Sequence, residues 1–228
     1  MRSSTSIIRK KLLRKGAEAN LYQGYWFGKK VIFKHRIEKA YREKTLDLNI
    51  RAMRTLNEGK ALIKVKEEGI NVPQVYEIDM KSALIIMKYI EGQRLKDLMS
   101  NLINSQKIQI FYDIGRQVAR LHINGHIHGD ITTSNLLITD DNQVFLIDFG
   151  LHEYSDTIED KSVDLHLFKR VLISTHGSDF KSCFHAFLEG YKSEYKLSEK
   201  DESKIIIKNI SAIERRGRYV KRDKKEHG

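Results

Sequence analysis

The segment His128-Gly-Asp-Ile-Thr-Thr-Ser-Asn135 is followed by Asp148-Phe-Gly150, and these two motifs decide how the chain folds around them. A run of apolar residues over 144–147 leads directly into Asp148, which is typical of a buried strand that ends at the acid. The pattern therefore predicts two loops that carry two carboxylates and one amide. An ordinary polar loop and turn is the alternative, but it does not account for the combination.

Two acids and an amide in this order are the set that phosphoryl transfer from ATP requires. Asp130 is predicted to be the catalytic residue, accepting the proton of the attacking hydroxyl. Asn135 and Asp148 are predicted to hold Mg²⁺ against the phosphates. The cofactors expected from these motifs are ATP and Mg²⁺.

Composition limits the class of protein. The chain has 228 residues, of which 40% are hydrophobic and 31% charged, as expected for a globular chain with one or two packed lobes. No apolar run is long enough to span a membrane, and the basic N-terminus lacks the apolar core of a signal peptide. A single cysteine, Cys183, excludes an internal disulfide, so we expect a cytoplasmic protein with no membrane partner.

The formal net charge is +11, which is high for this length. Such a charge favours a polyanionic partner, such as nucleic acid, or an acidic protein surface. A lysine-rich composition without any specific partner explains the charge equally well.

Apolar periodicity predicts an order of elements in two halves. The first half is expected to contain strands over 7–13, 21–26, 31–35, 74–79 and 83–89, with one long helix over 49–68. The second half is expected to contain strands over 136–138 and 144–147, with helices over 94–103, 106–124, 163–174, 180–191 and 199–214. The domains follow as 1–90, 91–214 and a basic C-terminal tail over 215–228.

A lysine in the third strand and a glutamate in the helix are candidates for holding the nucleotide. Lys34 lies in an apolar run over 31–35, where an unpaired charge would be costly. Glu58 shares a helical face with Ala61, Leu62 and Val65, so it can meet that lysine as a buried partner. The pair would hold the α- and β-phosphates. The alternative is an edge lysine and a tolerated surface glutamate.

The turn between the first two strands lies where a phosphate-binding loop belongs. It contains one glycine instead of three and it carries an acid, so by itself it is a weak signal. The hinge after the fifth strand, 87–90, would read the adenine edge with its backbone. The predicted cofactor-binding residues in these two segments are Gly16, Ala17, Glu18, Ala19, Asn20, Met87 and Tyr89.

Several features of ordinary protein kinases are missing. Gly129 stands where an arginine would pair with a phosphorylated loop, and Thr132 where a lysine would contact the transferred phosphoryl group. No Ala-Pro-Glu follows Gly150, because Pro73 is the only proline. We therefore expect a complete ATP site and a reduced site for protein substrates.

The motifs Gly16-Ala-Glu-Ala-Asn-Leu-Tyr, Asn57-Glu-Gly-Lys-Ala-Leu, His128-Gly-Asp and Asp148-Phe-Gly-Leu together resemble the small atypical kinase of the KEOPS complex, the Bud-thirty-two family. The resemblance covers essentially the whole chain, including Arg215-Arg-Gly-Arg. The Rio kinases share the Glu-Ala-Asn lid and His-Gly-Asp but differ after the Asp. Aminoglycoside-type phosphotransferases share His-Gly-Asp-x4-Asn but have a larger helical half.

The resemblance implies a role that depends on partners. Family members take part in making threonylcarbamoyladenosine in tRNA, acting as an ATPase with weak Ser/Thr autophosphorylation. It implies that a threonylcarbamoyl transferase subunit binds the helical lobe, and that a small activator subunit docks on the strand-rich lobe. The basic tail would then contact the tRNA backbone, and a solvated end is the alternative. Its basic residues are Arg215, Arg216, Arg218, Lys221, Arg222, Lys224 and Lys225.

The predicted fold is α+β, a minimal two-lobed protein-kinase-like domain with a strand-rich N-lobe and a helical C-lobe. The predicted function is an Mg-ATP-dependent atypical Ser/Thr kinase that acts mainly as a partner-stimulated ATPase. The alternatives are a nucleotide-bound scaffold that bridges partners and tRNA, and a Rio-like free-standing protein kinase. His122, His126 and His128 are expected to pack and brace the loop, and Asp164 to anchor its backbone.

Overall fold

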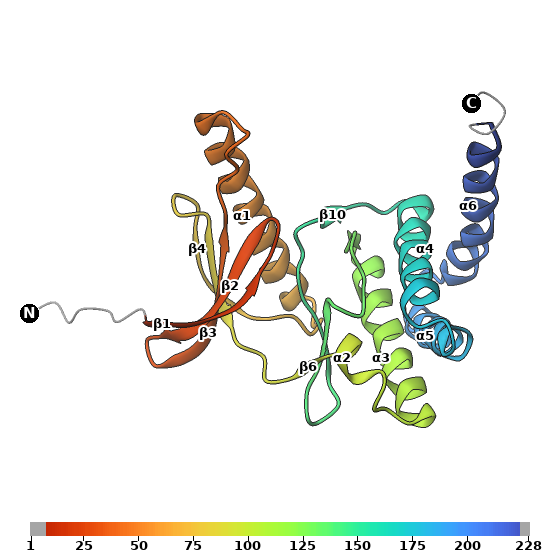
Figure 1. Ribbon diagram of the computed structural model, residues 1–228. Coiled ribbons are helices and arrows are strands. Elements are labelled where there is room, and N and C mark those ends of the chain that lie inside the picture. The colour runs from red at the N-terminus through yellow and green to blue at the C-terminus, as the bar shows by residue number, and fades with distance from the viewer. Residues whose placement is uncertain (1–7, 224–228) are drawn as a thin grey trace, which may run out of the picture. The chain divides into compact units, whose positions relative to one another are not determined.

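The computed structural model describes residues 8–223 of the chain (Figure 1). The chain divides into two compact units, Met1–Glu91 and Gly92–Gly228. The first unit is built on strands with one long helix, and the second is mostly helical. This confirms the predicted α+β class with strands first and helices after. No helix within residues 8–223 is long and apolar enough to cross a lipid bilayer.

The first unit contains an antiparallel five-stranded sheet with the order β1-β2-β3-β5-β4. Each of the five predicted strands is present, with both bounds within two residues of the predicted ones. Strands β2 and β3 pair in unbroken register, with Leu21 opposite Lys34. The strands are β1 (Ile8–Lys15), β2 (Ala19–Trp26), β3 (Lys29–Arg36), β4 (Val75–Asp79) and β5 (Leu84–Lys88).

Helix α1 (Lys44–Glu67) packs against strands β4 and β5 of this sheet. Val31 and Phe33 of β3 belong to a separate apolar cluster with Leu84 and Ile86. Because successive residues of a strand point to opposite faces, Lys34 lies on the other face.

The helix begins before the predicted residue 49, because Glu43 caps it. The Glu43 carboxylate accepts hydrogen bonds from the amides of Thr45 and Leu46, at 2.9 and 2.7 Å. This satisfies donors at the helix start that would otherwise have no partner.

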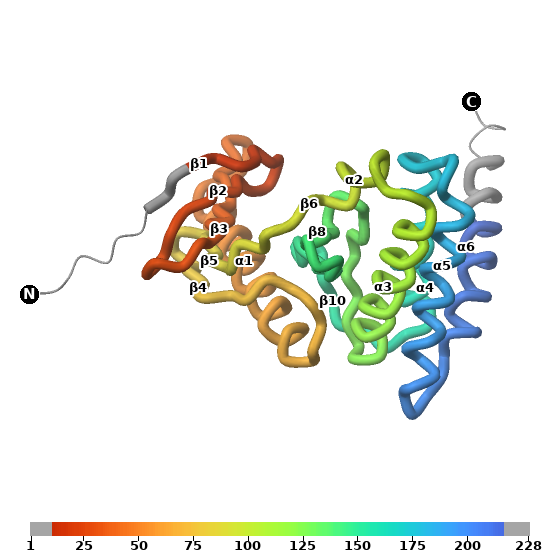
Figure 2. Tube along the Cα trace, turned by 90° about the horizontal axis from the view of Figure 1, so that it is seen from below, coloured from red at the N-terminus to blue at the C-terminus, as the bar shows by residue number. Residues whose placement is uncertain are grey.

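The second unit is organised by helices that run side by side (Figure 2). Helices α3 and α5 approach closely at Gly115 and Gly190. A Cβ atom at Gly190 would lie 1.9 Å from the Tyr112 carbonyl oxygen, so only glycine permits this distance. The helices are α2 (Leu95–Leu98), α3 (Asn104–Ile123), α4 (Ile158–Thr175), α5 (Phe180–Tyr195) and α6 (Ser203–Asp223).

The prediction of a helix over 94–103 is correct only for the short stretch Leu95–Leu98. Gln93 and Arg94 form strand β6, which pairs with β8, and only the single turn α2 follows. The backbone at Gly92 passes so close to β8 that a Cβ there would lie 2.7 Å from the Ile138 carbonyl oxygen. Pairing with a strand distant in sequence has therefore overridden a local helical pattern. The short strands are β6 (Gln93–Arg94), β7 (His126–Ile127), β8 (Leu136–Ile138), β9 (Val144–Leu146) and β10 (Glu153–Tyr154).

Helix α6 continues past Glu214 to Asp223, so the first part of the basic segment is helical. Arg216 forms an exposed ion pair with Glu159 at 2.7 Å. The side chains of Arg218, Lys221 and Arg222, and the whole of Lys224 and Lys225, lie outside the described part of the chain.

Candidate active site

The loop between β7 and β8 brings Asp130 and Asn135 together. The Asn135 amide nitrogen donates to the Asp130 carboxylate at 2.8 Å and to its carbonyl oxygen at 3.0 Å. The loop also closes on itself through the backbone N–H of Asn135, which donates to the Thr132 carbonyl oxygen at 2.9 Å. The four residues between Asp130 and Asn135 thus form a compact turn that fixes one side chain against the other.

Asp164 of α4 holds the entrance to this loop. Its carboxylate accepts the backbone N–H groups of His128 and Gly129, at 3.1 and 3.0 Å, and also contacts His122 Nε2 at 3.2 Å. His122 is held in turn by the Tyr191 hydroxyl group at 2.8 Å. Asp164 and His122 are fully buried. The structure therefore confirms the expected anchoring role of Asp164.

Gly129 replaces the arginine of ordinary protein kinases for a steric reason. Its φ angle is +78°, and an added Cβ would lie 2.4 Å from the Leu151 carbonyl oxygen. A side chain at this position would be strained in conformation and would also collide with the neighbouring segment.

Two ionisable side chains of the loop, Asp130 and His128, have shifted pKa values. Although Asp130 is exposed as a residue, partial desolvation of its carboxyl group raises the pKa of Asp130, against the hydrogen bond from Asn135. Burial lowers the pKa of His128, more strongly than the neighbouring carboxylates raise it. Neutral His128 fits its contact, because its Nδ1 accepts the Asp130 amide at 3.3 Å. A raised pKa moves Asp130 toward the range that suits a general base.

Asp148 follows β9 with a φ angle of +68°, a left-handed conformation that is uncommon outside glycine. The residue is exposed, and its Oδ1 lies 3.4 Å from the Gly150 amide nitrogen. Phe149 is buried against the His128 ring, with 4.6 Å between the ring centroids. Packing of Phe149 therefore fixes the turn that presents the Asp148 carboxylate. Non-glycine residues in a left-handed conformation, as Asp148 is, are often found at functional sites.

The side-chain oxygens of Asn135 and Asp148 are suitable ligands for a hard divalent cation. The Asn135 amide nitrogen is occupied by Asp130, so the remaining polar atom of that side chain is the carbonyl oxygen Oδ1. Mg²⁺ prefers carboxylate and carbonyl oxygens. Asn135 and Asp148 therefore offer the oxygen types that would hold Mg²⁺.

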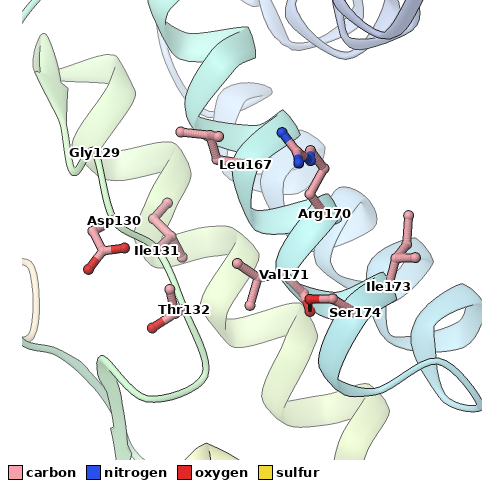
Figure 3. Close-up of a pocket in the computed structure, with 9 residues that line it drawn as sticks. All are labelled: Gly129, Asp130, Ile131, Thr132, Leu167, Arg170, Val171, Ile173 and Ser174. Carbon is pink, nitrogen blue, oxygen red and sulfur yellow. Dashed lines mark hydrogen bonds between the residues drawn. The ribbon is translucent and has the colours of Figure 1, made fainter. Parts of the chain in front are cut away.

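A pocket of about 550 Å³ opens beside Asp130. In Figure 3 the Gly129–Thr132 segment forms one wall and helix α4 forms the other. Val171 and Ile173 make the α4 wall partly apolar, while Arg170 adds a positive charge. The sequence did not point to this pocket, because its walls come from segments that are distant along the chain.

In the first unit, Lys34 and Glu58 meet as an ion pair. Lys34 Nζ lies 2.5 Å from Glu58 Oε1, and both side chains are buried. A second cation shares the same carboxylate, because Arg36 Nη2 lies 2.7 Å from Glu58 Oε2. Sequence reasoning missed Arg36. The available signal was strand periodicity, since residues two apart in a strand share a face.

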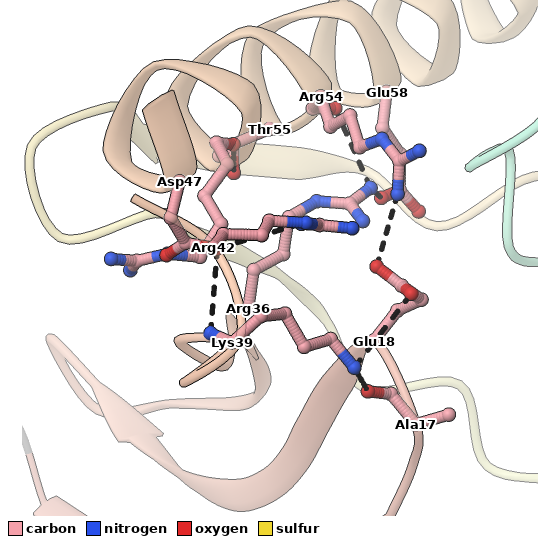
Figure 4. A network of polar contacts seen from close by, with 10 residues as sticks. Ala17, Glu18, Arg36, Lys39, Arg42, Asp47, Arg54, Thr55 and Glu58 are labelled. Atoms are coloured by element: carbon pink, nitrogen blue, oxygen red, sulfur yellow. Dashed lines mark hydrogen bonds and ion pairs between the residues drawn. The ribbon is translucent and has the colours of Figure 1, made fainter. Parts of the chain in front are cut away.

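The lid turn is held by polar contacts (Figure 4). A Cβ at Gly16 would lie 2.6 Å from the Ala19 carbonyl oxygen, so the turn needs glycine at its first position. Glu18 pairs with Arg54 of α1 at 3.0 Å, and Lys39 Nζ donates to the Ala17 carbonyl oxygen. Asn20, at the end of the lid, pairs with His35 in the β2–β3 ladder.

The arginines of α1 also have partners. Arg54 binds the lid through Glu18, and Arg51 pairs with buried Asp47 at 2.6 Å. The Arg54 side chain remains 46% exposed in its ion pair, whereas the Arg51 side chain is only 16% exposed.

The predicted hinge has fewer available donors than expected. The amides of Lys88 and Tyr89 already donate to the carbonyl oxygens of Gln74 and Lys30, at 2.8 and 3.2 Å. Met87 is buried within β5. If this segment were to bind adenine, as expected from the sequence, it would have to use its carbonyl groups or other amides.

The three histidines before Asp130 occupy the interior of the second unit. His122 and His128 support the loop as described above. His126 Nδ1 lies 2.8 Å from His152 Nε2, and burial lowers the pKa of His152 to about 4. Within residues 8–223, no three His, Cys, Asp or Glu side chains are grouped so as to hold a metal ion.

Comparison with known proteins identifies relatives along nearly the whole chain. Residues 27–157 match the family model of the RIO domain. The chain is 43% identical over 218 residues to "KEOPS complex subunit Bud32" of Pyrococcus abyssi, covering 93% of this chain and 97% of that protein.

Longer archaeal proteins contain a similar region. The chain is 41% identical over 209 residues to "Probable bifunctional tRNA threonylcarbamoyladenosine biosynthesis protein" of Methanocaldococcus jannaschii, and 40% identical over 206 residues to a protein of the same name from Methanosphaera stadtmanae. The two alignments cover 92% and 90% of this chain but only 37% and 36% of those longer proteins.

The RIO-domain match covers more than half of the chain, and the Pyrococcus protein aligns over almost all of both sequences. Both findings agree with the resemblance carried by the lid, helix and loop motifs. The chain therefore belongs to the RIO-domain atypical kinases and, within them, to the Bud32 family of KEOPS subunits.

Proposed function

We propose that this protein is an Mg-ATP-dependent atypical Ser/Thr kinase that works mainly as a partner-stimulated ATPase in making threonylcarbamoyladenosine in tRNA. The observation that carries the proposal is the Asp130–Asn135 hydrogen bond in a loop anchored by buried Asp164. Asp148 beyond β9 provides the second acid. The names of the relatives support the biosynthetic role.

Each residue has a stated part in this proposal. Asp130 orients the attacking hydroxyl group or water and accepts its proton, for which its raised pKa is suitable. Asn135 and Asp148 hold Mg²⁺, whose contribution is to neutralise charge on the phosphates. Lys34, fixed by Glu58, binds the α- and β-phosphates, and the lid 16–20 covers them.

The two compact units would be the N-lobe and C-lobe of the kinase, followed by the basic segment 215–228. The transferase subunit of KEOPS is proposed to bind the C-lobe and the small activator subunit the N-lobe. Arg215 and Arg216, both exposed, support contact between the basic segment and the tRNA backbone.

The test is ATP hydrolysis by the purified chain, alone and with the transferase subunit plus tRNA. Strong stimulation that disappears in Asp148→Ala supports a partner-gated ATPase. Low, equal hydrolysis in both samples, with nucleotide still bound, supports the alternative of a nucleotide-bound scaffold.

A second variant separates the same alternatives inside the complex. Asp130→Asn leaves the loop hydrogen bond largely intact but removes the base. If the protein is an ATPase, turnover stops while the complex still assembles. If it is a scaffold, tRNA modification survives the substitution.

The pocket beside Asp130 favours one further possibility, transfer to a hydroxyl group on a larger acceptor. Its volume of about 550 Å³ exceeds what a water nucleophile needs, and Arg170 lines it. Arg170→Ala should then lower phosphorylation of an acceptor but leave ATP hydrolysis unchanged. Equal loss of both activities would argue against a separate acceptor site.

A further inference from the structure

The Glu58 carboxylate is shared by two cations of the same strand. Lys34 occupies Oε1 at 2.5 Å and Arg36 occupies Oε2 at 2.7 Å. Figure 4 shows Arg36 extending from β3 toward Glu58 of helix α1. The exposed fractions of Lys34, Arg36 and Glu58 are only 8%, 5% and 2%, so solvent screens these charges weakly.

The charges of the three residues are unequal, with two cations for one carboxylate. A guanidinium group stays protonated at any physiological pH, so Arg36 always supplies one positive charge to Glu58. If Lys34 alone faced Glu58, the single carboxylate would neutralise the single ammonium group. With Arg36 present, the negative charge of Glu58 is divided between two partners.

We infer that Arg36 is a positioning residue that prepares Lys34 for nucleotide phosphates. By occupying Oε2, Arg36 fixes the orientation of the carboxylate and leaves Oε1 for Lys34. By balancing the charge of Glu58, it leaves more of the Lys34 charge for an anionic ligand. This inference rests on the proposed function, in which Lys34 binds phosphates.

The remaining contacts of Arg36 suit this role better than a general structural one. Its Nη2 approaches the Arg54 carbonyl oxygen only at 3.5 Å, the limit of a hydrogen bond. Its Nε is buried and has no hydrogen-bond partner within the described residues. The strong interaction of the guanidinium group is therefore the one with Glu58.

The test measures binding of Mg-ATP and Mg-ADP to the whole chain by isothermal titration calorimetry in a double-mutant cycle. The variants are Arg36→Gln, Lys34→Met and the double substitution. Arg36→Gln should weaken binding about tenfold when Lys34 is present, and less than about twofold in the Lys34→Met background. A purely structural role predicts the same loss in both backgrounds, and that result would overturn the inference.

Arg51→Gln provides a matched control. Asp47 is also a buried carboxylate shared by two arginines, Arg42 and Arg51, at 3.4 and 2.6 Å, and it lies on the same helix. This control removes a comparable ion pair without touching Glu58, so nucleotide affinity should stay within about twofold of wild type. A larger loss would mean that any damage to this helix weakens binding, and it would overturn the specific role of Arg36.

Arg36→Lys keeps the charge on a shorter side chain and serves if Arg36→Gln does not fold. It should weaken binding about threefold with Lys34 present and not at all in the Lys34→Met background. No difference between the backgrounds would refute the inference for this variant too. If wild type and Lys34→Met bind nucleotide equally, the proposed phosphate role of Lys34 fails. If Lys34→Met loses affinity but Arg36→Gln does not, only the inference about Arg36 fails.

Discussion

Replacing Asp164 by asparagine should loosen the catalytic loop and destabilise the second unit. The aspartate carboxylate accepts two backbone N–H groups, at 3.1 and 3.0 Å, in a fully buried position. Asparagine keeps one acceptor oxygen, but its NH₂ group must face an N–H donor. One hydrogen bond to a charged acceptor is then lost and a buried donor is left unpaired.

Hydrogen bonds to a charged group contribute about 1.5–3 kcal/mol, and an unpaired buried donor costs about 1–3 kcal/mol. These contributions overlap, so we expect Asp164→Asn to lower the free energy of unfolding by about 2–4 kcal/mol. Burial opposes ionisation of Asp164, but the hydrogen bonds that its carboxylate accepts from His122 and from the His128 backbone amide outweigh it, so the pKa of Asp164 is lowered. The wild-type carboxylate is thus ionised at neutral pH, as this reasoning requires.

The measurement is urea unfolding at pH 7, followed by circular dichroism, together with ATP hydrolysis. Asp160→Asn is the control, because Asp160 lies on the same helix but, among the residues that the structure describes, its carboxylate binds only Ser155 and Thr157 near the surface. It should cost about 1 kcal/mol or less. If Asp164→Asn is no less stable than Asp160→Asn and hydrolyses ATP normally, the anchoring role is refuted.

Gly190→Ala should strongly destabilise the chain, by about 3 kcal/mol or more, because its Cβ would lie 1.9 Å from the Tyr112 carbonyl oxygen. Gly177→Ala is the matched control in thermal unfolding, since its Cβ would meet only the Ile173 carbonyl oxygen at 3.5 Å, and equal melting temperatures would contradict the close approach. Acidification should also destabilise the protein through His152, whose pKa is about 4 when folded and near 6.5 when unfolded. The unfolded state then binds more protons between these values, so stability is present above pH 6.5 and is lost as pH falls toward 4. After halving for the partial exposure of His152, the free energy of unfolding should fall by about 1 kcal/mol between pH 7 and pH 5. This decrease should be missing in His152→Phe. An equal pH dependence of stability in both proteins would exclude His152 as its cause.

The sequence predicted the structure most accurately where a residue pattern lies within a single strand or helix. The strand-like run over 144–147 predicted an acid at the end of a strand, and Asp148 lies two residues after the end of β9 at Leu146. Helical periodicity placed Glu58 on the apolar face of α1, where it is buried with Ala61 and Leu62. Such patterns act within one element, so their consequences can be derived from spacing alone.

Features that depend on distant segments were not predictable in this way. The helix expected over 94–103 is mostly absent because Gln93 and Arg94 pair with β8. The pocket beside Asp130 needs α4 to lie against the loop at Gly129. Each depends on a register or a packing distance that residue spacing does not contain.

The sequence by itself determined the residue types of the candidate site, its family and the order of strands and helices. Tertiary structure alone decided that Arg36 shares Glu58 with Lys34, and that helix α4 lies against the loop at Gly129 to form the pocket beside Asp130. The physical reason is the distance along the chain between the residues that interact. Spacing along the chain decides which face a side chain occupies, whereas the partner of a buried charge depends on how separate elements pack.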